Sequence, residues 1–276
     1  MAATPLGNPG DASPRLKDAI AAAEIIAAED SRRFHRLCSD IGVTFTGRVI
    51  SFFDGNETLR SEEILQYLQA GKNVLVVSDA GMPTISDPGF RLARDAMAQN
   101  IEVKVIPGPS APVMAVALSG LATDRFSFEG FTPRAVGARQ AAFESLRFEE
   151  RTMVFFEAPH RLVESLEDAL AIFGSKRRGA ICREMTKTYE ETIRGSLAEL
   201  LEWAQSKEVL GEITLVIAGA EIGTAEKSAD QMVSRVRDFE AAGMDRKSAI
   251  ATVADEFDLP KRIVYAAVVD ANKMSK

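Results

Sequence analysis

A short apolar run that leads into a long loop of small residues is the feature that most limits how this chain can fold. Asn73–Val77 has the composition of a buried strand, and the loop Ser78–Gly89 carries two acids before a helical pattern begins. In open α/β sheets, ligands bind where loops leave the carboxyl ends of the strands. We therefore expect Asp79–Met82 to face a ligand, whereas Asp87–Pro88 suits the N-cap and first turn of the following helix.

The same alternation of apolar strands and helical patterns runs through the first part of the chain. It predicts parallel βαβ units, because two parallel strands need a crossover helix between them. The predicted strands are 24–28, 48–53, 73–77 and 102–106, and the predicted helices are 14–22, a basic helix after Arg32 to about Asp40, 58–70 and the segments after Asp87 and Ser110.

From about Asp124 the pattern changes, and it predicts a second α/β unit with a more mixed sheet. Its strands are expected at 126–131, 152–156, 179–183, 190–194 and 212–218, and its helices at 137–148, 162–173 and 197–205. Three further helices near 228–242, 246–257 and 260–271 have helix-turn-helix spacing, which suits nucleic-acid contact, and they equally suit a small helical appendage or a dimerisation element. The predicted fold class is α/β, with domains at 1–120 and 121–222 and a helical tail at 223–276.

Composition and cysteine usage narrow the class of protein further. Hydrophobic residues make up 46% of the 276 residues and charged residues 26%, which is typical of a globular protein with a full core. No apolar run is long enough to span a membrane, no secretory signal is recognised, and Cys38 and Cys182 lack metal-type or disulfide-framework spacing. The lack of a disulfide framework leads us to expect a cytoplasmic protein. Because the chain also has only 2 histidines, we expect no metal site.

The loops that contain glycine indicate which cofactor the first unit can hold. The chain has neither the G-x-G-x-x-G pattern of dinucleotide sites nor a Walker A motif, and Pro9 removes an amide N–H from the early loop Thr4–Gly10. Nucleotide cofactors are therefore disfavoured. Small-residue loops at 5–7, 79–83 and 107–111 would let backbone groups approach a ligand closely. This suits S-adenosylmethionine, which has no phosphate and carries a sulfonium and an ammonium group.

Nine colinear segments resemble the tetrapyrrole methylase superfamily, and within it the branch of methyltransferases that act on small-subunit ribosomal RNA. They are ATPLGN (3–8), AAEDSR (27–32), SDAGMPTISDPG (78–89), PGPSA (107–111), GLATDRF (120–126), FEGFTPR (128–134), EAPHR (157–161), REMTK (183–187) and GE (211–212). The resemblance implies two α/β domains with S-adenosylmethionine in the cleft between them, usually in a homodimer. It also implies methylation of the ribose 2′-hydroxyl of a cytidine in the decoding region of 16S rRNA.

The resemblance further implies which residues form the site. The implied cofactor contacts are Leu6, Asp79, Gly81, Met82, Ser110, Ala111, Phe156, Cys182 and Thr214. A ribose hydroxyl is a poor nucleophile at neutral pH, so a positioned base would assist it. The candidates at strand ends of the second unit are Glu157, Glu184 and Lys187. Glu184 and Lys187, three residues apart, equally suit a mutual ion pair.

The charge distribution bears on how RNA would bind. A net charge of −7 predicts weak binding of free RNA, because affinity for a polyanion rests on neutralised phosphates, so an assembled small subunit is the more natural partner. The candidate RNA contacts, each of which also suits an ordinary surface or helix-start position, are Arg32, Arg33, Arg36, Arg134, Arg139, His160 and Arg161. Two other functions stay open: a tetrapyrrole C-methyltransferase, and a non-catalytic regulator that binds nucleic acid through the helical tail.

Overall fold

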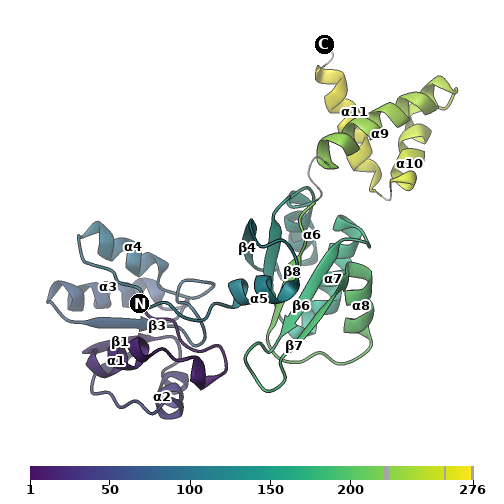
Figure 1. The fold of residues 1–276 in the computed structure, drawn as a ribbon. Coiled ribbons are helices and arrows are strands. Elements are labelled where there is room, and N and C mark those ends of the chain that lie inside the picture. Colours follow the sequence, from purple (N-terminus) through teal and green to yellow (C-terminus); the bar gives the residue numbers. More distant parts are fainter. Residues whose placement is uncertain (221–223, 258, 275–276) are drawn as a thin grey trace.

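Two sheets with helices packed around them form the body of the molecule (Figure 1). The computed structural model describes residues 1–220, 224–257 and 259–274. In the first sheet β1 (Ile25–Ala28) is central, and β2 (Arg48–Ser51) and β3 (Val74–Val77) flank it, both parallel to it. Because the three strands are in register, the loops that follow them all leave at the same edge of the sheet.

Helices cover both faces of this sheet, as the alternating pattern predicts. Ile26 packs in one buried cluster with Leu16, whereas its neighbour Ala27 packs in another with Leu92, because successive strand residues point to opposite faces. The helices are α1 (Pro14–Ala22) and α2 (Ser31–Asp40) on the first face, and α3 (Glu57–Gln69) and α4 (Phe90–Ala98) on the second.

The strand predicted at 102–106 is wrong. The structure places a single isolated bridge there, between Ala2 and Ile106. The Ala3 N–H donates to the Ile106 carbonyl at 3.1 Å, and the Ile106 N–H donates to the Met1 carbonyl at 2.9 Å. A strand requires consecutive pairs along a neighbour, and among the described residues this stretch forms a bridge only at Ile106.

The helix after the loop Ser78–Gly89 begins later than predicted. Its N-cap is Gly89 at φ +121°, and the Gly89 N–H donates to Glu57 Oε1 at 2.9 Å. A carboxylate from α3 therefore supplies the negative charge that a helix N-terminus favours. The prediction that Asp87 is the N-cap is wrong for this reason, and its side chain faces the cavity described below.

The second sheet is mixed, as predicted: its order is β4-β5-β8-β6-β7, with β4 and β5 parallel and the other neighbours antiparallel. Its strands are β4 (Phe126–Phe131), β5 (Thr152–Glu157), β6 (Arg178–Arg183), β7 (Glu191–Ser196) and β8 (Ile213–Ile217). One face is covered by α6 (Val136–Ser145), α7 (Leu162–Phe173) and α8 (Leu197–Gln205), and the other by α5 (Ala111–Ser119).

Helix α5 belongs in sequence to the predicted first domain but packs on the second sheet. Its Ala115 and Val116 share a buried cluster with Val154, Ala180 and Val216 from that sheet. The chain therefore passes between the two sheets just before α5, and the predicted domain limits of 1–120 and 121–222 remain a prediction.

A short 3₁₀ turn, Pro159–Arg161, leads from β5 into α7.

The tail forms a three-helix cluster that lies apart from both sheets in Figure 1. Its helices α9 (Thr224–Ala241), α10 (Arg246–Glu256) and α11 (Lys261–Met274) share a core that includes Val236, Val253 and Val264. Asp245 caps α10 as predicted. The predicted domain boundary at residues 222 and 223 lies outside the described residues. None of the described helices is both long and apolar enough to cross a lipid bilayer.

Candidate active site

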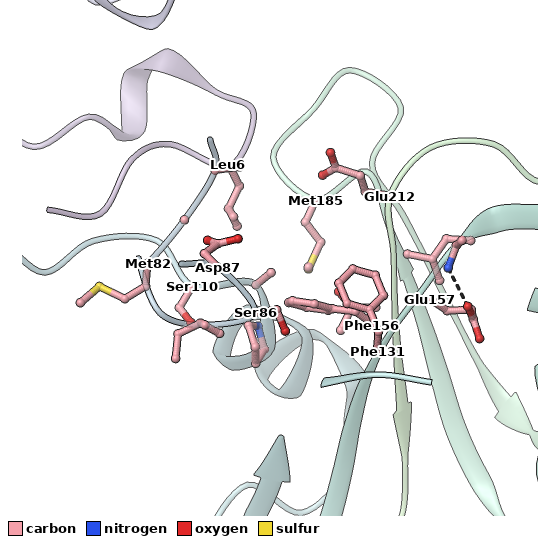
Figure 2. A pocket seen from close by; sticks show the side chains of 18 of the residues that line it. Leu6, Met82, Ser86, Asp87, Ser110, Phe131, Phe156, Glu157, Met185 and Glu212 are labelled. Atoms are coloured by element: carbon pink, nitrogen blue, oxygen red, sulfur yellow. Dashed lines mark hydrogen bonds between the residues drawn. The ribbon is translucent and has the colours of Figure 1, made fainter. Parts of the chain in front are cut away.

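A cavity of about 300 Å³ lies where loops from the two sheets meet (Figure 2). The first sheet's side contributes residues 80–82 and 85–87, with Leu6 from the N-terminal segment. Residues 110–112 enter at the start of α5, and residues 156–159 and 211–214 come from the second sheet, together with Phe131 and Met185. The volume lies at the lower end of the range for small-molecule pockets.

Backbone pairing with the N-terminal segment holds the loop after β3 in place. The Thr4 N–H donates to the Gly81 carbonyl at 2.9 Å, and the Gly81 N–H donates to the Thr4 carbonyl at 3.1 Å. Gly81 has φ +84°, and a Cβ there would lie 3.0 Å from Leu6 Cδ2, so this position needs glycine. Thr84 and Ser86 also have positive φ, a strained backbone of the kind that concentrates at binding sites.

An aromatic pair forms the wall that the second sheet contributes. The rings of Phe131 and Phe156 lie 5.3 Å apart in an edge-to-face arrangement. Phe131 is 57% exposed, so a ligand can reach this residue. Met185, which follows β6, and Thr214, on β8, complete this side. The wall is mostly apolar and suits a planar ring.

The cavity has an acidic lining. Its acidic residues are Asp87, Glu157 and Glu212, and no Lys, Arg or His occurs among the described residues that line it. Arg161 and Lys187, outside the lining, pair with Glu157 and Glu212, so Asp87 is the lining acid whose charge no ion pair offsets. Such a lining favours a cationic ligand and disfavours a phosphate. S-adenosylmethionine, the predicted cofactor, fits this requirement because its sulfonium and ammonium groups are cations.

Asp87 is a lining acid that was predicted to cap a helix rather than to face the cavity. Burial and the negative charge of Glu29, helped by those of Asp79 and Asp54, raise the pKa of Asp87 to about 7, against a hydrogen bond from Ser78 that lowers it. A carboxyl that titrates near neutral pH inside a cavity is typical of a functional site. Its sequence signal, an acid before Pro-Gly at a helix start, is shared with ordinary N-caps.

Glu157 stands at the end of β5, but its carboxylate points away from the cavity (Figure 2). It is fully buried and pairs with Arg161 Nη2 at 2.7 Å. It also accepts hydrogen bonds from the Ala158 N–H at 2.7 Å and from the hydroxyls of Thr132 and Ser165. Because these donors occupy its oxygens, the geometry gives no support to Glu157 as a base. Arg161 also donates to the Thr132 carbonyl at 3.1 Å, so its guanidinium binds groups within the protein.

Glu184 and Lys187 form the ion pair that their spacing suggested, with 2.8 Å between Glu184 Oε1 and Lys187 Nζ. Lys187 Nζ also lies 3.1 Å from Glu212 Oε2. Burial acts to lower the pKa of Lys187, but its hydrogen bonds to Glu184 and Glu212 outweigh that effect and raise it. Lys187 is therefore protonated at neutral pH and has no lone pair with which to accept a proton.

The loop that carries this ion pair also touches the N-terminal segment. The Asn8 N–H donates to Thr186 Oγ1 at 3.2 Å. A Cβ on Gly7 would lie 2.3 Å from Lys187 Cγ, so the lysine stem rests directly on that glycine. Glu184 and Thr186 both have positive φ. The two sides of the cavity thus meet through strained loops at its edge.

Most of the predicted cofactor contacts come together in the cavity. Those that line it are Leu6, Gly81, Met82, Ser110, Ala111, Phe156 and Thr214. The Asp79 carboxylate lies outside the lining, where it accepts the Asp30 N–H at 2.9 Å and pairs with Arg33 at 3.3 Å. Cys182 is also outside it, and its Sγ donates to the Ala115 carbonyl at 3.7 Å. Burial raises the pKa of Cys182 to about 11, as expected for an unreactive core thiol.

The predicted RNA contacts divide into exposed and buried residues. The exposed ones are Arg32, Arg33 and Arg36 on α2, Arg134 before α6, and His160. Arg139 is only 1% exposed, and it pairs with Asp168 at 2.7 Å and with Glu164 at 3.5 Å. The prediction that Arg139 contacts RNA is wrong, because acids of α7 enclose its guanidinium.

Several lining residues from the second sheet were not predicted, among them Phe131, Met185 and Glu212. These three lie within segments that carry the family resemblance, FEGFTPR, REMTK and GE. The resemblance therefore identified segments that contribute to the cavity, but it did not identify which of their side chains line it.

Comparisons with known proteins agree with this geometry. The family model described as Tetrapyrrole (Corrin/Porphyrin) Methylases matches residues 1–201. The protein named "Ribosomal RNA small subunit methyltransferase I" of Mycobacterium tuberculosis is 46% identical over 274 residues, which cover 99% of this chain and 95% of the relative. The protein of the same name from Pseudomonas aeruginosa is 38% identical over 268 residues, covering 96% and 94%.

The fold also matches a solved structure, a uroporphyrin-III C-methyltransferase from Thermus thermophilus complexed with S-adenosylhomocysteine. The TM-score is 0.56 at 15% identity, and the match covers 79% of this chain and 95% of that one. At this level of identity the likeness concerns the fold alone.

Proposed function

Because the chain belongs to the tetrapyrrole methylase family, we propose that it methylates the ribose 2′-hydroxyl of a cytidine in the decoding region of 16S rRNA, with S-adenosylmethionine as methyl donor. The observation that carries this proposal is the acidic cavity between the two sheets, whose described lining holds no basic side chain. The relatives' name, which matches nearly the whole chain, supports ribosomal RNA as the substrate.

The residues of this chain would bind and align the cofactor. We propose contacts from Leu6, Gly81, Met82, Ser110, Ala111, Phe156 and Thr214. When bound, the cofactor supplies a methyl group on a positively charged sulfur. The acidic lining favours that charge, and fixed alignment of hydroxyl, methyl and sulfur contributes several kcal/mol to the rate.

Ribosomal RNA would approach over exposed basic residues. We propose Arg32, Arg33 and Arg36 on α2, together with Arg134 and His160, as phosphate contacts. Few such contacts and a net charge of −7 favour the assembled small subunit over free RNA, because each neutralised phosphate adds affinity. A homodimer, a cytoplasmic location, domain limits at 1–120, 121–222 and 223–276, and an RNA contact from the tail complete the proposal.

The test of this function is methylation of small subunits isolated from a strain that lacks the gene. Purified protein and radiolabelled S-adenosylmethionine should label 16S rRNA. Primer extension at low nucleotide concentration should then show one new ribose-methylation stop at a cytidine. Labelled RNA without such a stop would contradict ribose as the acceptor, and no labelled RNA would contradict rRNA as the substrate.

A tetrapyrrole substrate is the control for the rival enzyme. The match to a C-methyltransferase of tetrapyrroles supports only a shared fold, at 15% identity. We therefore expect no transfer to uroporphyrinogen III under conditions that label small subunits. A non-catalytic regulator predicts no binding of S-adenosylmethionine, which calorimetry measures directly.

A further inference from the structure

A ribose hydroxyl must lose a proton as its oxygen attacks a methyl carbon, so the proposed function calls for a base in the cavity. Lys187 cannot serve, because its raised pKa keeps it protonated. Glu157 turns away and is saturated with donors. Glu212 is 68% exposed and holds Lys187 at 3.1 Å. Of the acids that line the cavity, this leaves Asp87.

Asp87 has the placement that a base requires. Its side chain lines the cavity, and in Figure 2 its carboxylate lies beside Leu6, across the cavity from Met185. Within the described chain no cation forms an ion pair with it. The carboxylate therefore keeps an oxygen available for a substrate.

The surrounding chain fixes Asp87 in this position. Gly89, two residues later, is held by Glu57 at the start of α4, and Ser86, one residue earlier, has φ +62°. These constraints hold the backbone from which the Asp87 side chain projects. Because the Glu57 carboxylate accepts the N–H at the start of α4, the Asp87 carboxylate does not cap that helix.

We propose that Asp87 is the general base that takes the proton from the 2′-hydroxyl of the target ribose. This inference rests on the proposed function. As the ribose oxygen forms its bond to the methyl carbon, the carbon–sulfur bond breaks and its electron pair goes to sulfur, which becomes neutral. The hydroxyl proton moves to a carboxylate oxygen of Asp87 and is later released to water, so that charge and atoms balance.

The groups around Asp87 set its proton affinity. On the first sheet's side the acids Glu29, Asp54 and Asp79 raise its pKa, after burial, to about 7. The opposite wall contributes Glu212, whose charge Lys187 offsets. A base with this pKa is charged above about pH 7 and protonated below it, so the methylation rate should rise with pH through this value and then level off.

The test compares wild-type protein with Asp87→Asn in single turnovers on small subunits, with saturating cofactor, from pH 6 to 9. Loss of a general base should slow the rate by about 10²- to 10⁴-fold and abolish its rise with pH. Asp87→Glu should restore part of the pH-dependent rate. The matched control is Asp95→Asn on exposed α4, where the lost partner is Arg94 at the surface.

Calorimetry gives a second readout that does not depend on activity. A cation in the cavity favours the charged form of Asp87, so wild-type protein should release protons when it binds S-adenosylmethionine near pH 7. Asp87→Asn should bind the cofactor without that release, and its affinity should fall only by the lost attraction to the cation, far less than the rate falls. Proton release is measured from the dependence of the binding enthalpy on the buffer.

Two outcomes would overturn the inference. One is a variant Asp87→Asn that keeps the wild-type rate and pH profile. The other is a cofactor affinity that falls by the same factor as the rate, since Asp87 would then hold the cofactor rather than the proton. If wild-type protein does not label small subunits at all, the proposed function fails, and the calorimetric release still reports whether Asp87 faces the bound cofactor.

Discussion

Replacing Arg139 by alanine should destabilise the second sheet's half of the protein without acting on RNA directly. Arg139 Nε lies 2.7 Å from Asp168 Oδ2, and the two side chains are 1% and 12% exposed. Removing one partner of a buried pair leaves the other charge uncompensated, at a cost of about 3–5 kcal/mol. Gln140 still donates to Asp168 at 2.7 Å, so we expect the lower end, about 3 kcal/mol.

Urea unfolding followed by tryptophan fluorescence measures this loss. The chain's one tryptophan, Trp203, lies on α8 in the same helical layer as α6. At a typical m of about 2 kcal/mol/M, a loss of about 3 kcal/mol lowers the midpoint by about 1.5 M. The double variant Arg139→Ala with Asp168→Ala should recover part of the stability, because the one acid that it leaves without Arg139 is Glu164, which is 62% exposed.

Arg134→Ala is the matched control, since Arg134 is an exposed arginine that precedes α6 in the chain. It should leave the free energy of unfolding nearly unchanged. The reasoning is refuted if Arg139→Ala unfolds at the same urea concentration as Arg134→Ala. It is also refuted if Arg139→Ala keeps full stability and weakens RNA binding.

Three further variants test other parts of the structure. Ser196→Ala should cost about 1 kcal/mol in urea unfolding, because it removes the capping box that Ser196 forms with Glu199 at the start of α8. Gly211→Ala should raise the dissociation constant of S-adenosylmethionine about tenfold, equivalent to about 1.4 kcal/mol, as measured by calorimetry. The reason is that Gly211 has φ +92° and that a Cβ there would lie 2.5 Å from Glu184 Cγ. An unchanged affinity would contradict a role for this edge of the cavity. Phe131→Ala should weaken RNA binding by about 1–3 kcal/mol in filter assays while Phe131→Trp preserves it, because the exposed ring offers a stacking face to a base; equal losses in both variants would count against stacking.

Local signals were enough to predict many elements of the fold. The predicted helices 162–173 and 197–205 are confirmed at both ends. Gly174, at φ +89°, ends the first of them, and Ser196 caps the second. Such signals act over three or four residues, so they survive in any tertiary context. The family resemblance likewise marked the stretches of chain that line the cavity.

Side-chain direction at the site was decided by the tertiary structure. Asp79 and Asp87 lie in the same loop, yet only Asp87 lines the cavity. The difference arises because Arg33 pairs with Asp79, while Glu57 caps α4 in place of Asp87. Both partners lie about thirty or more residues away along the chain.

By itself, the sequence determined the α/β class and most of the order of strands and helices, because these depend on neighbouring residues. Only the tertiary structure decided that Arg139 is a buried partner of Asp168 and that the stretch 102–106 forms an isolated bridge. The physical reason is common to both: burial, ion pairing and strand pairing depend on which distant residue arrives at the other side of a contact.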